Sequence, residues 1–185
     1  LAAPLQGKRV AHLSATAFGG GVAEINFALV PLMRSAGLDA ERLIIHGDDE
    51  FFNVTKKIHN ALQGNPQVLS AEEQQIYHRY NALNAEDFDE AEYDFVINHD
   101  PQPAAMIDHY ADRRARWIWR CHIDLSEPNR EVLDILLPSI CRHDAAIFHR
   151  PEYVPDTDRL PEAFIWPPAI DPLTPKNMAL SAEDA

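Results

Sequence analysis

Short apolar segments alternate with amphipathic segments along this chain of 185 residues, and no other feature constrains its fold as strongly. The amphipathic segments carry apolar residues at helical spacing, and no two-residue hairpin turns join the apolar ones. Strands joined by helices pair in parallel. The pattern therefore predicts an α/β fold: a parallel sheet with helices on both faces. Its six expected strands are Arg9–Ser14, Ala40–His46, Tyr93–Asn98, Trp117–His122, Asp144–His149 and Ala163–Trp166.

Proline and capping residues mark the expected helices. Pro31 predicts a kink or a break in the first helix, Val22–Ser35. Ser70–Glu73 resembles a capping box ahead of the helix Glu72–Leu83. A proline opens the helix Pro128–Leu137, where its missing N–H is tolerated. The other expected helices are Phe51–Leu62 and Pro103–Tyr110.

The composition changes after Trp166. Four prolines crowd the nine residues 167–175, and a polar tail follows. This composition is typical of a linker and supplies no core. We therefore expect one domain over residues 1–166, which is long enough to bury a sizeable core, and a hinge or linker over residues 167–185. The chain begins without Met and stops as it leaves the domain, so we expect it to be a fragment.

The charge balance argues against nucleic acid as a partner. The chain has 16 Lys and Arg residues against 29 Asp and Glu residues, a formal net charge of −13. Nucleic-acid binders present a basic face instead. The densest basic cluster has Asp108 and Asp112 beside it, and we expect a solvated helix end there. The cluster consists of Arg113, Arg114 and Arg116.

The sequence predicts neither a membrane partner nor secretion. No apolar stretch approaches the roughly 20 residues that a membrane-spanning helix needs. The first residues lack the pattern of a signal peptide. The two cysteines, Cys121 and Cys141, are expected to be reduced thiols. We therefore expect a cytoplasmic protein.

Candidate ligand-binding residues follow the strands, since ligands bind beyond the carboxyl ends of parallel strands. Gly19–Gly21 lie between the first strand and the first helix. Glycines let a ligand approach the backbone, and the N-terminus of a helix favours an anion such as a phosphate. The alternative is a tight loop that binds nothing.

Polar side chains follow the third and fourth strands. Asp100 and Gln102 sit among prolines, and a carboxylate with an amide suits the hydroxyl groups of a sugar. His122 and Asp124 are two residues apart, so both could face one side of an extended chain. The alternatives are helix capping by Asp100 and a structural histidine bonded to the backbone.

Two further segments contain residue types found in sugar sites. Asn53 lies beside two aromatic residues in Glu50–Asn60. That segment is either part of a sugar site or an amphipathic helix with two core phenylalanines. Phe148–Tyr153, after the fifth strand, is either a binding segment or a surface loop.

Taken together, five segments resemble one family, the trehalose glycosyltransferring synthases, over the N-terminal half of its members. The resemblance runs from about Lys8 to Leu180, and the combination is more specific than any single segment. The segments are Gly19–Glu24, Glu50–Lys56, His99–Ala105, Trp119–Ser126 and Pro167–Leu173.

The resemblance implies the N-terminal half of a GT-B fold, in which two Rossmann-like domains face each other across a cleft. Members of this family transfer glucose from a nucleoside diphosphate glucose to glucose, and form trehalose with retention at the anomeric carbon. This half would hold the acceptor, and an absent C-terminal domain beyond the hinge would bind the nucleotide. No tightly bound cofactor is implied, because the nucleoside diphosphate glucose is a substrate. The fragment alone is expected to be inactive, and a homodimer stays open.

The resemblance also implies roles for single residues. Gly20 and Gly21 would approach the diphosphate and the sugar of the donor. Asp100 would bond the acceptor sugar, and His122 would lie at the donor glucose near the reacting carbon. These two are the candidate catalytic residues, and no metal site is expected. The candidates for further acceptor contacts are Asn53, Gln102 and Asp124.

Two other functions stay open on the sequence alone. One is a metal-dependent hydrolase that uses a cluster of histidines and carboxylates, although no His-Glu-x-x-His motif is present. The other is a sugar-binding module without catalysis. The residues available for the metal cluster are His12, His99, Asp100, His122 and Asp124.

Overall fold

The computed structural model describes residues 2–169 and 177 of the chain. Within these residues six strands form one sheet, and every neighbouring pair is parallel. The predicted parallel α/β sheet is therefore confirmed, and predicted strand ends differ from observed ones by no more than two residues. The strands are β1 (Arg9–Ser14), β2 (Asp39–Ile44), β3 (Phe95–His99), β4 (Arg116–Arg120), β5 (Ala145–Phe148) and β6 (Glu162–Ile165).

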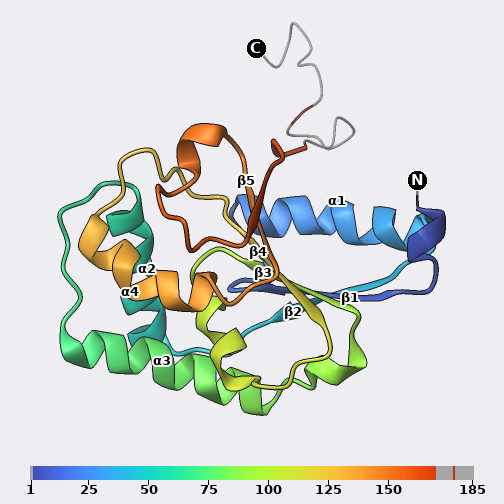
Figure 1. The fold of residues 1–185 in the computed structure, drawn as a ribbon. Helices are drawn as coiled ribbons and strands as arrows, with labels where there is room; N and C mark the ends of the chain where they lie inside the picture. The colour runs from blue at the N-terminus through green and yellow to red at the C-terminus, as the bar shows by residue number, and fades with distance from the viewer. Residues whose placement is uncertain (1, 170–176, 178–185) are drawn as a thin grey trace, which may run out of the picture.

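Helices flank the sheet on both faces, as predicted (Figure 1). The segment predicted as the helix Pro103–Tyr110 is a 3₁₀ helix, η3 (Ala104–His109). The α-helices are α1 (Gly21–Ser35), α2 (Asp49–Leu62), α3 (Ala71–Glu86) and α4 (Arg130–Ile140). The 3₁₀ helices are η1 (Ala3–Leu5), η2 (Glu90–Glu92), η3 (Ala104–His109) and η4 (Pro151–Tyr153).

Helix ends follow capping chemistry more closely than proline positions. The capping box of α3 is confirmed, because Ser70 and Glu73 each accept the backbone N–H of the other. The break considered at Pro31 does not occur, since α1 continues to Ser35 and its packing against the sheet outweighs the lost hydrogen bond.

The start predicted for α4 is wrong. Pro128 lies ahead of this helix, and the helix begins after Asn129, whose side chain accepts the N–H of Val132 at 3.3 Å. The helix then runs through Pro138 to Ile140. The capping side chain, which satisfies a free N–H, therefore sets the first turn instead of the proline.

The two faces of the sheet are covered by different sets of helices. α1 packs Val30 against Val10 of β1 and Ala40 of β2. On the opposite face, α2, α3, α4 and η3 enclose a larger core, which contains Trp117 and Trp119 of β4. No helix in the described part of the chain is long and apolar enough to cross a bilayer.

The strand order is β2–β1–β3–β4–β5–β6. The chain therefore leaves β1 toward β2 on one side and returns to β3 on the other. In parallel α/β sheets, the ligand-binding crevice opens outside the carboxyl ends of the strands at such a reversal. Most of the predicted linker, residues 170–176 and 178–185, lies outside the described residues.

Candidate functional site

A row of histidines lies at the carboxyl edge of the sheet. Nδ1 of His12, in β1, is 3.0 Å from Nε2 of His99, in β3. Nδ1 of His99 is in turn 2.9 Å from Nε2 of His122, which follows β4. Neighbouring rings in this row are nearly parallel, with 22° and 20° between their planes, and meet edge to edge through these nitrogens, whereas the ring of His149, after β5, is steeply inclined to that of His122. Two of the histidines thus lie in β1 and β3, and the other two follow β4 and β5.

Strand register explains the row. Paired residues of neighbouring parallel strands project to the same face of a sheet, and so do residues two apart in one strand. His12 pairs with Ile97, and His99 pairs with Arg120. His12, His99 and Arg120 therefore share the face that α1 covers.

Burial keeps these histidines neutral at pH 7. It lowers the pKa of His12 to about 4 and the pKa of His122 to about 3. The pKa of His99 falls well below its ordinary value, again chiefly because the ring is buried. The guanidinium of Arg120 lowers the pKa of each ring further, because a nearby positive charge disfavours the imidazolium.

Asp100 is held by β4 and the loop after it. Its N–H donates to the carbonyl of Arg120, and its carbonyl accepts from Nε1 of Trp119, both at 2.9 Å. Its carboxylate accepts the backbone N–H of His122 at 2.7 Å. The helix-capping alternative is therefore wrong, since the carboxylate is turned toward β4 and Pro103 is the N-cap of η3.

The backbone and the carboxyl group of Asp100 are both in unusual states. Its φ is 63°, and no other non-glycine residue in the described part of the chain has a positive φ. A left-handed backbone costs about 1–2 kcal/mol for a residue with a Cβ atom. Burial also raises the pKa of the carboxyl group to about 7, against the opposing effects of the His122 N–H and Arg120. Strain and a shifted pKa at one residue are typical of functional sites.

The glycine loop, Gly19–Gly21, brings backbone N–H groups to the same edge of the sheet. Gly20 is the N-cap of α1, with a φ of 83°, and Gly21 is the first residue of the helix. A Cβ atom added at either residue would meet nothing within 4 Å. A ligand could therefore approach the backbone closely at these two residues, where the N-terminus of α1 favours an anion.

The three weaker candidates are more scattered. Asn53 is exposed on α2. Gln102 is half-buried after β3, where its backbone carbonyl accepts a hydrogen bond from the side chain of Asn81 at 3.1 Å. Asp124 is exposed, and its carboxylate accepts the N–H and the hydroxyl of Ser126 within its own turn. No hydrogen bond among the described residues joins any of the three to Asp100 or His122.

Some polar groups near this edge were not singled out by the sequence. The hydroxyl of Ser14, at the end of β1, and both amide atoms of Asn26, in α1, are buried without a partner among the described residues. Such groups call for a ligand or an ordered water. The burial of Asn26 could have been predicted from the sequence, because Asn26 lies four residues from both Val22 and Val30, on the apolar side of the predicted helix.

A shallow hollow of about 450 Å³ adjoins the carboxyl ends of β1 and β2. It lies beside the glycine loop, although neither Asp100 nor His122 lines it. Its lining residues are Ala15–Phe18, Ile44–Gly47 and Phe52.

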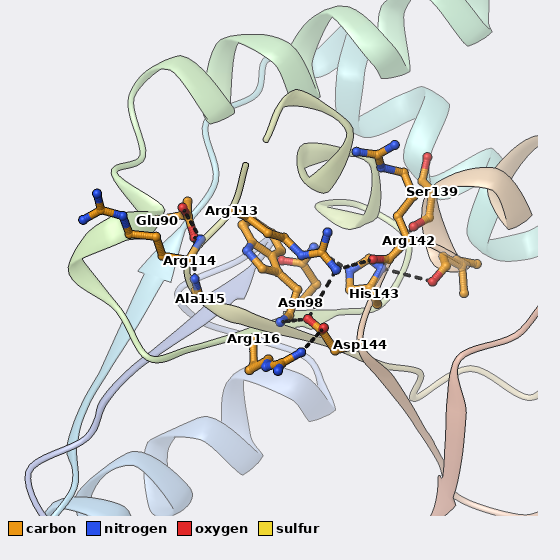
Figure 2. Close-up of polar contacts among 12 residues, drawn as sticks. Glu90, Asn98, Arg113, Arg114, Ala115, Arg116, Ser139, Arg142, His143 and Asp144 are labelled. Carbon is orange, nitrogen blue, oxygen red and sulfur yellow. Dashed lines mark hydrogen bonds and ion pairs between the residues drawn. The ribbon is translucent and has the colours of Figure 1, made fainter. Parts of the chain in front are cut away.

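The basic cluster lies at the opposite edge of the sheet, where Figure 2 shows its contacts. Arg116 is the first residue of β4, and its guanidinium lies 2.8 Å from the carboxylate of Asp144. Arg113 contacts the same carboxylate at 3.4 Å. The predicted helix end is therefore wrong for this cluster, because β4 and the loop before it carry the arginines. The predicted exposure to solvent is confirmed for Arg114 and Arg116.

The histidine and carboxylate groups are not arranged as a metal site. No group of three or more His, Cys, Asp or Glu side chains in residues 2–169 or at 177 is placed to hold a metal ion. The ring nitrogens of His12, His99 and His122 that face one another are occupied by their mutual hydrogen bonds. Cys121 and Cys141 are free thiols, as predicted.

Comparison with known proteins gives a consistent result over the whole chain. Residues 12–155 match the family model for the N-terminal domain of trehalose synthase. The chain is 52% identical to a trehalose synthase of Rubrobacter xylanophilus over 189 residues, which cover the whole chain and 45% of that protein. Identity is 50% to the trehalose synthases of Thermococcus litoralis and Pyrococcus horikoshii, over 97% and 95% of the chain and 44% and 42% of those proteins. The chain thus spans less than half the length of these relatives.

Proposed function

Because the chain belongs to the trehalose synthase N-terminal domain family, we propose that it is the acceptor-side half of a retaining GT-B glycosyltransferase. The complete enzyme transfers glucose from a nucleoside diphosphate glucose to glucose and forms trehalose. The observation that carries this proposal is the identity of 50–52% along nearly the whole chain to proteins named trehalose synthase. In this proposal the nucleotide binds to a C-terminal half outside residues 1–185.

The donor side of the proposed site consists of the glycine loop and His122. Gly20 and Gly21 receive the diphosphate, which is supported by the open space above them and by the N-terminus of α1. The leaving diphosphate gains negative charge as the glycosidic carbon becomes cationic, and preorganised N–H groups stabilise that charge. His122 lies at the donor glucose in this arrangement.

The acceptor side consists of Asp100, with Asn53, Gln102 and Asp124 as further contacts. The left-handed backbone and the bond to the His122 N–H hold the carboxyl group of Asp100 beside the donor-side histidine. A fixed acceptor hydroxyl makes the transfer effectively unimolecular, which supplies much of the rate enhancement. We propose attack from the front face, assisted by the leaving phosphate, with no carboxylate nucleophile from this half.

The two alternative functions receive less support. The metal-dependent hydrolase would need the histidines as metal ligands, but they bond one another. The non-catalytic sugar-binding module does not account for the identity to enzymes named as synthases. We also propose a cytoplasmic location, which is supported by the two free thiols.

The test is glucosyl transfer by the full-length protein that contains this chain. The protein would be incubated with glucose and with UDP-, ADP- or GDP-glucose, and the product identified by NMR as trehalose with both anomeric carbons in the α configuration. The chain of residues 1–185 alone should show no transfer. Absence of trehalose with all three donors, or turnover by the chain alone, contradicts the proposal.

A matched pair of histidine substitutions tests the site. His122→Asn should lower kcat/KM by about a hundredfold, by analogy with the loss of one preorganised polar group. His109→Asn, at the exposed end of η3, should leave kcat/KM unchanged. Equal effects of the two substitutions would place the site elsewhere.

A further inference from the structure

The histidine row continues into α1 and ends on a sulfur atom. Nε2 of His12 lies 3.3 Å from Sδ of Met33, in the last turns of α1. The chain of contacts is therefore Met33, His12, His99 and His122, with one hydrogen bond between each neighbouring pair. Each of the three histidines uses Nε2 toward the Met33 end, and His12 and His99 use Nδ1 toward the other.

The sulfur atom fixes the direction in which every hydrogen bond of this series is donated. A thioether accepts hydrogen bonds and has no proton to donate, so Nε2 of His12 must carry the hydrogen. A neutral imidazole has one N–H, so Nδ1 of His12 is then an acceptor and Nε2 of His99 must donate to it. The same reasoning makes Nδ1 of His99 an acceptor for Nε2–H of His122. All three rings are thereby held as Nε2–H tautomers.

The neutral state that this reasoning requires is supported by the surroundings. The three rings are largely buried, and burial lowers the pKa of each far below the ordinary value of histidine. The charged group that faces them is the guanidinium of Arg120, which opposes protonation of all three. No ring in the row therefore carries a second N–H at pH 7.

The free end of this series of hydrogen bonds is Nδ1 of His122. This atom is buried and has no hydrogen-bond partner among the described residues. A buried acceptor without a partner is destabilising, so the site is set up for an O–H donor that arrives with the ligand. A sugar hydroxyl is a donor of that kind.

We propose that Met33, His12 and His99 are positioning residues that hold His122 in its Nε2–H tautomer, with Nδ1 presented as an acceptor for a sugar hydroxyl. The proposal rests on the function proposed above, because it takes the hydroxyl to belong to a sugar substrate. The three residues act through His122 and touch no substrate themselves. Control of a tautomer by the partner of the other ring nitrogen is a general device in enzymes that use histidine.

The experiment measures the tautomer directly in the full-length protein labelled with ¹⁵N-histidine. Long-range ¹H–¹⁵N spectra distinguish a protonated from an unprotonated ring nitrogen, and His122→Asn assigns the signal. The wild-type protein should show His122 with protonated Nε2 and unprotonated Nδ1. An Nδ1–H tautomer of His122 overturns the proposal.

Two variants test whether this series of hydrogen bonds fixes the tautomer of His122. Met33→Leu removes the sulfur acceptor at nearly constant volume, and His99→Phe keeps an aromatic ring at this position but removes both hydrogen bonds. Each should give His122 a mixture of tautomers, and Met33→Leu should lower kcat/KM about fivefold, which corresponds to about 1 kcal/mol. Retention of the single Nε2–H tautomer in either folded variant overturns the proposal.

Met106→Leu is the matched control for Met33→Leu. Met106 is buried in η3 among the core residues of the opposite face, so the same change of side chain occurs away from the histidines. It should leave the tautomer of His122 and kcat/KM unchanged. A purely structural role of Met33 predicts equal effects of the two substitutions on stability and none on the tautomer. The spectra need no turnover, so they test the chain even if the full-length protein forms no trehalose.

Discussion

At the scale of single residues, the carboxyl edge of the sheet holds groups in states that their neighbours impose. Asp100 has a left-handed backbone and a carboxyl group whose pKa burial raises to about 7. His122 is neutral because it is buried and faces Arg120. Substitutions that change one hydrogen bond and keep the size of the side chain therefore distinguish an effect on the positioning of these groups from an effect on the free energy of unfolding.

Asp100 offers the first such separation. Asp100→Ala removes the acceptor of the His122 N–H and leaves a left-handed backbone without a polar side chain, so the free energy of unfolding should fall by about 2–3 kcal/mol. Asp100→Asn keeps an acceptor oxygen and tolerates this backbone, so its stability should stay within about 1 kcal/mol of wild type while glucosyl transfer falls about tenfold. Chemical denaturation and transfer assays measure both. Equal loss of stability in the two variants would show that the bond to His122 contributes little.

The glycine loop provides a second test at this scale. Gly20→Ala places a Cβ atom on a residue with a φ of 83°, which costs about 1–2 kcal/mol and should shift the loop. Gly7→Ala is the matched control, since Gly7 also has a positive φ and open space but precedes β1 at the opposite edge. Both should lower the free energy of unfolding similarly, and only Gly20→Ala should lower transfer, by about tenfold. Unchanged transfer in Gly20→Ala would argue against a diphosphate at this loop.

At the scale of elements, α3 holds the loops that follow β2 and β3. The hydroxyl of Tyr77 donates to the carbonyl of Pro101 at 2.7 Å, and Asn81 donates to the carbonyl of Gln102 at 3.1 Å. Asn84 bonds both backbone groups of His46, at 2.6 and 2.8 Å. These side chains are four and three residues apart, so they project from one face of the helix.

The contact of α3 with the loop after β2 can be removed on its own. Asn84→Ala leaves the N–H and the carbonyl of His46 without these partners, and should lower the free energy of unfolding by about 2–3 kcal/mol. Because His46 lines the hollow beside the glycine loop, where the donor diphosphate is proposed to bind, KM for the nucleoside diphosphate glucose should rise more than kcat falls. Gln75→Ala, at an exposed position of the same helix, is the control. Steady-state kinetics that match for the two variants would contradict the link between α3 and the site.

At the scale of the whole molecule, buried neutral histidines occur on both faces of the sheet. His12, His99 and His122 lie on the face of α1. His143, which follows α4, is buried with Asn98 on the other face, and burial lowers its pKa to about 4. Folding therefore prevents four histidines from binding protons that the unfolded chain binds below about pH 6.5.

Stability should accordingly fall as the pH falls from 7 to 5. The folded pKa values of these histidines are lowered, so their contribution is fully present above pH 6.5 and is lost on acidification, by about 1.4 kcal/mol per pH unit for each ring. Asp100 has the opposite effect, because its pKa is higher in the folded than in the unfolded chain. Its protonation raises the free energy of unfolding on acidification by about as much as one histidine lowers it. Chemical denaturation at several pH values measures the slope. A constant or rising free energy of unfolding on acidification would contradict the neutral histidines.

The sequence by itself determined the elements and the type of sheet. The bounds predicted for β1 are those observed, and the capping box at Ser70 starts α3. Both follow from patterns within a few residues: apolar periodicity and a side chain that satisfies a nearby N–H. The loops carrying Gly20, Asp100 and His122 were predictable for the same reason, since they follow recognisable strands.

Only the tertiary structure decided which strands lie side by side. Placing β1 next to β3, and β3 next to β4, brings His12, His99 and His122 into hydrogen-bond contact across a separation of 110 residues in the chain. It also ties the carboxylate of Asp100 to the N–H of His122 after β4, whereas the carboxylate of Asp124 is used within its own turn. Strand order depends on contacts between residues far apart in the chain, and local periodicity carries no information about them.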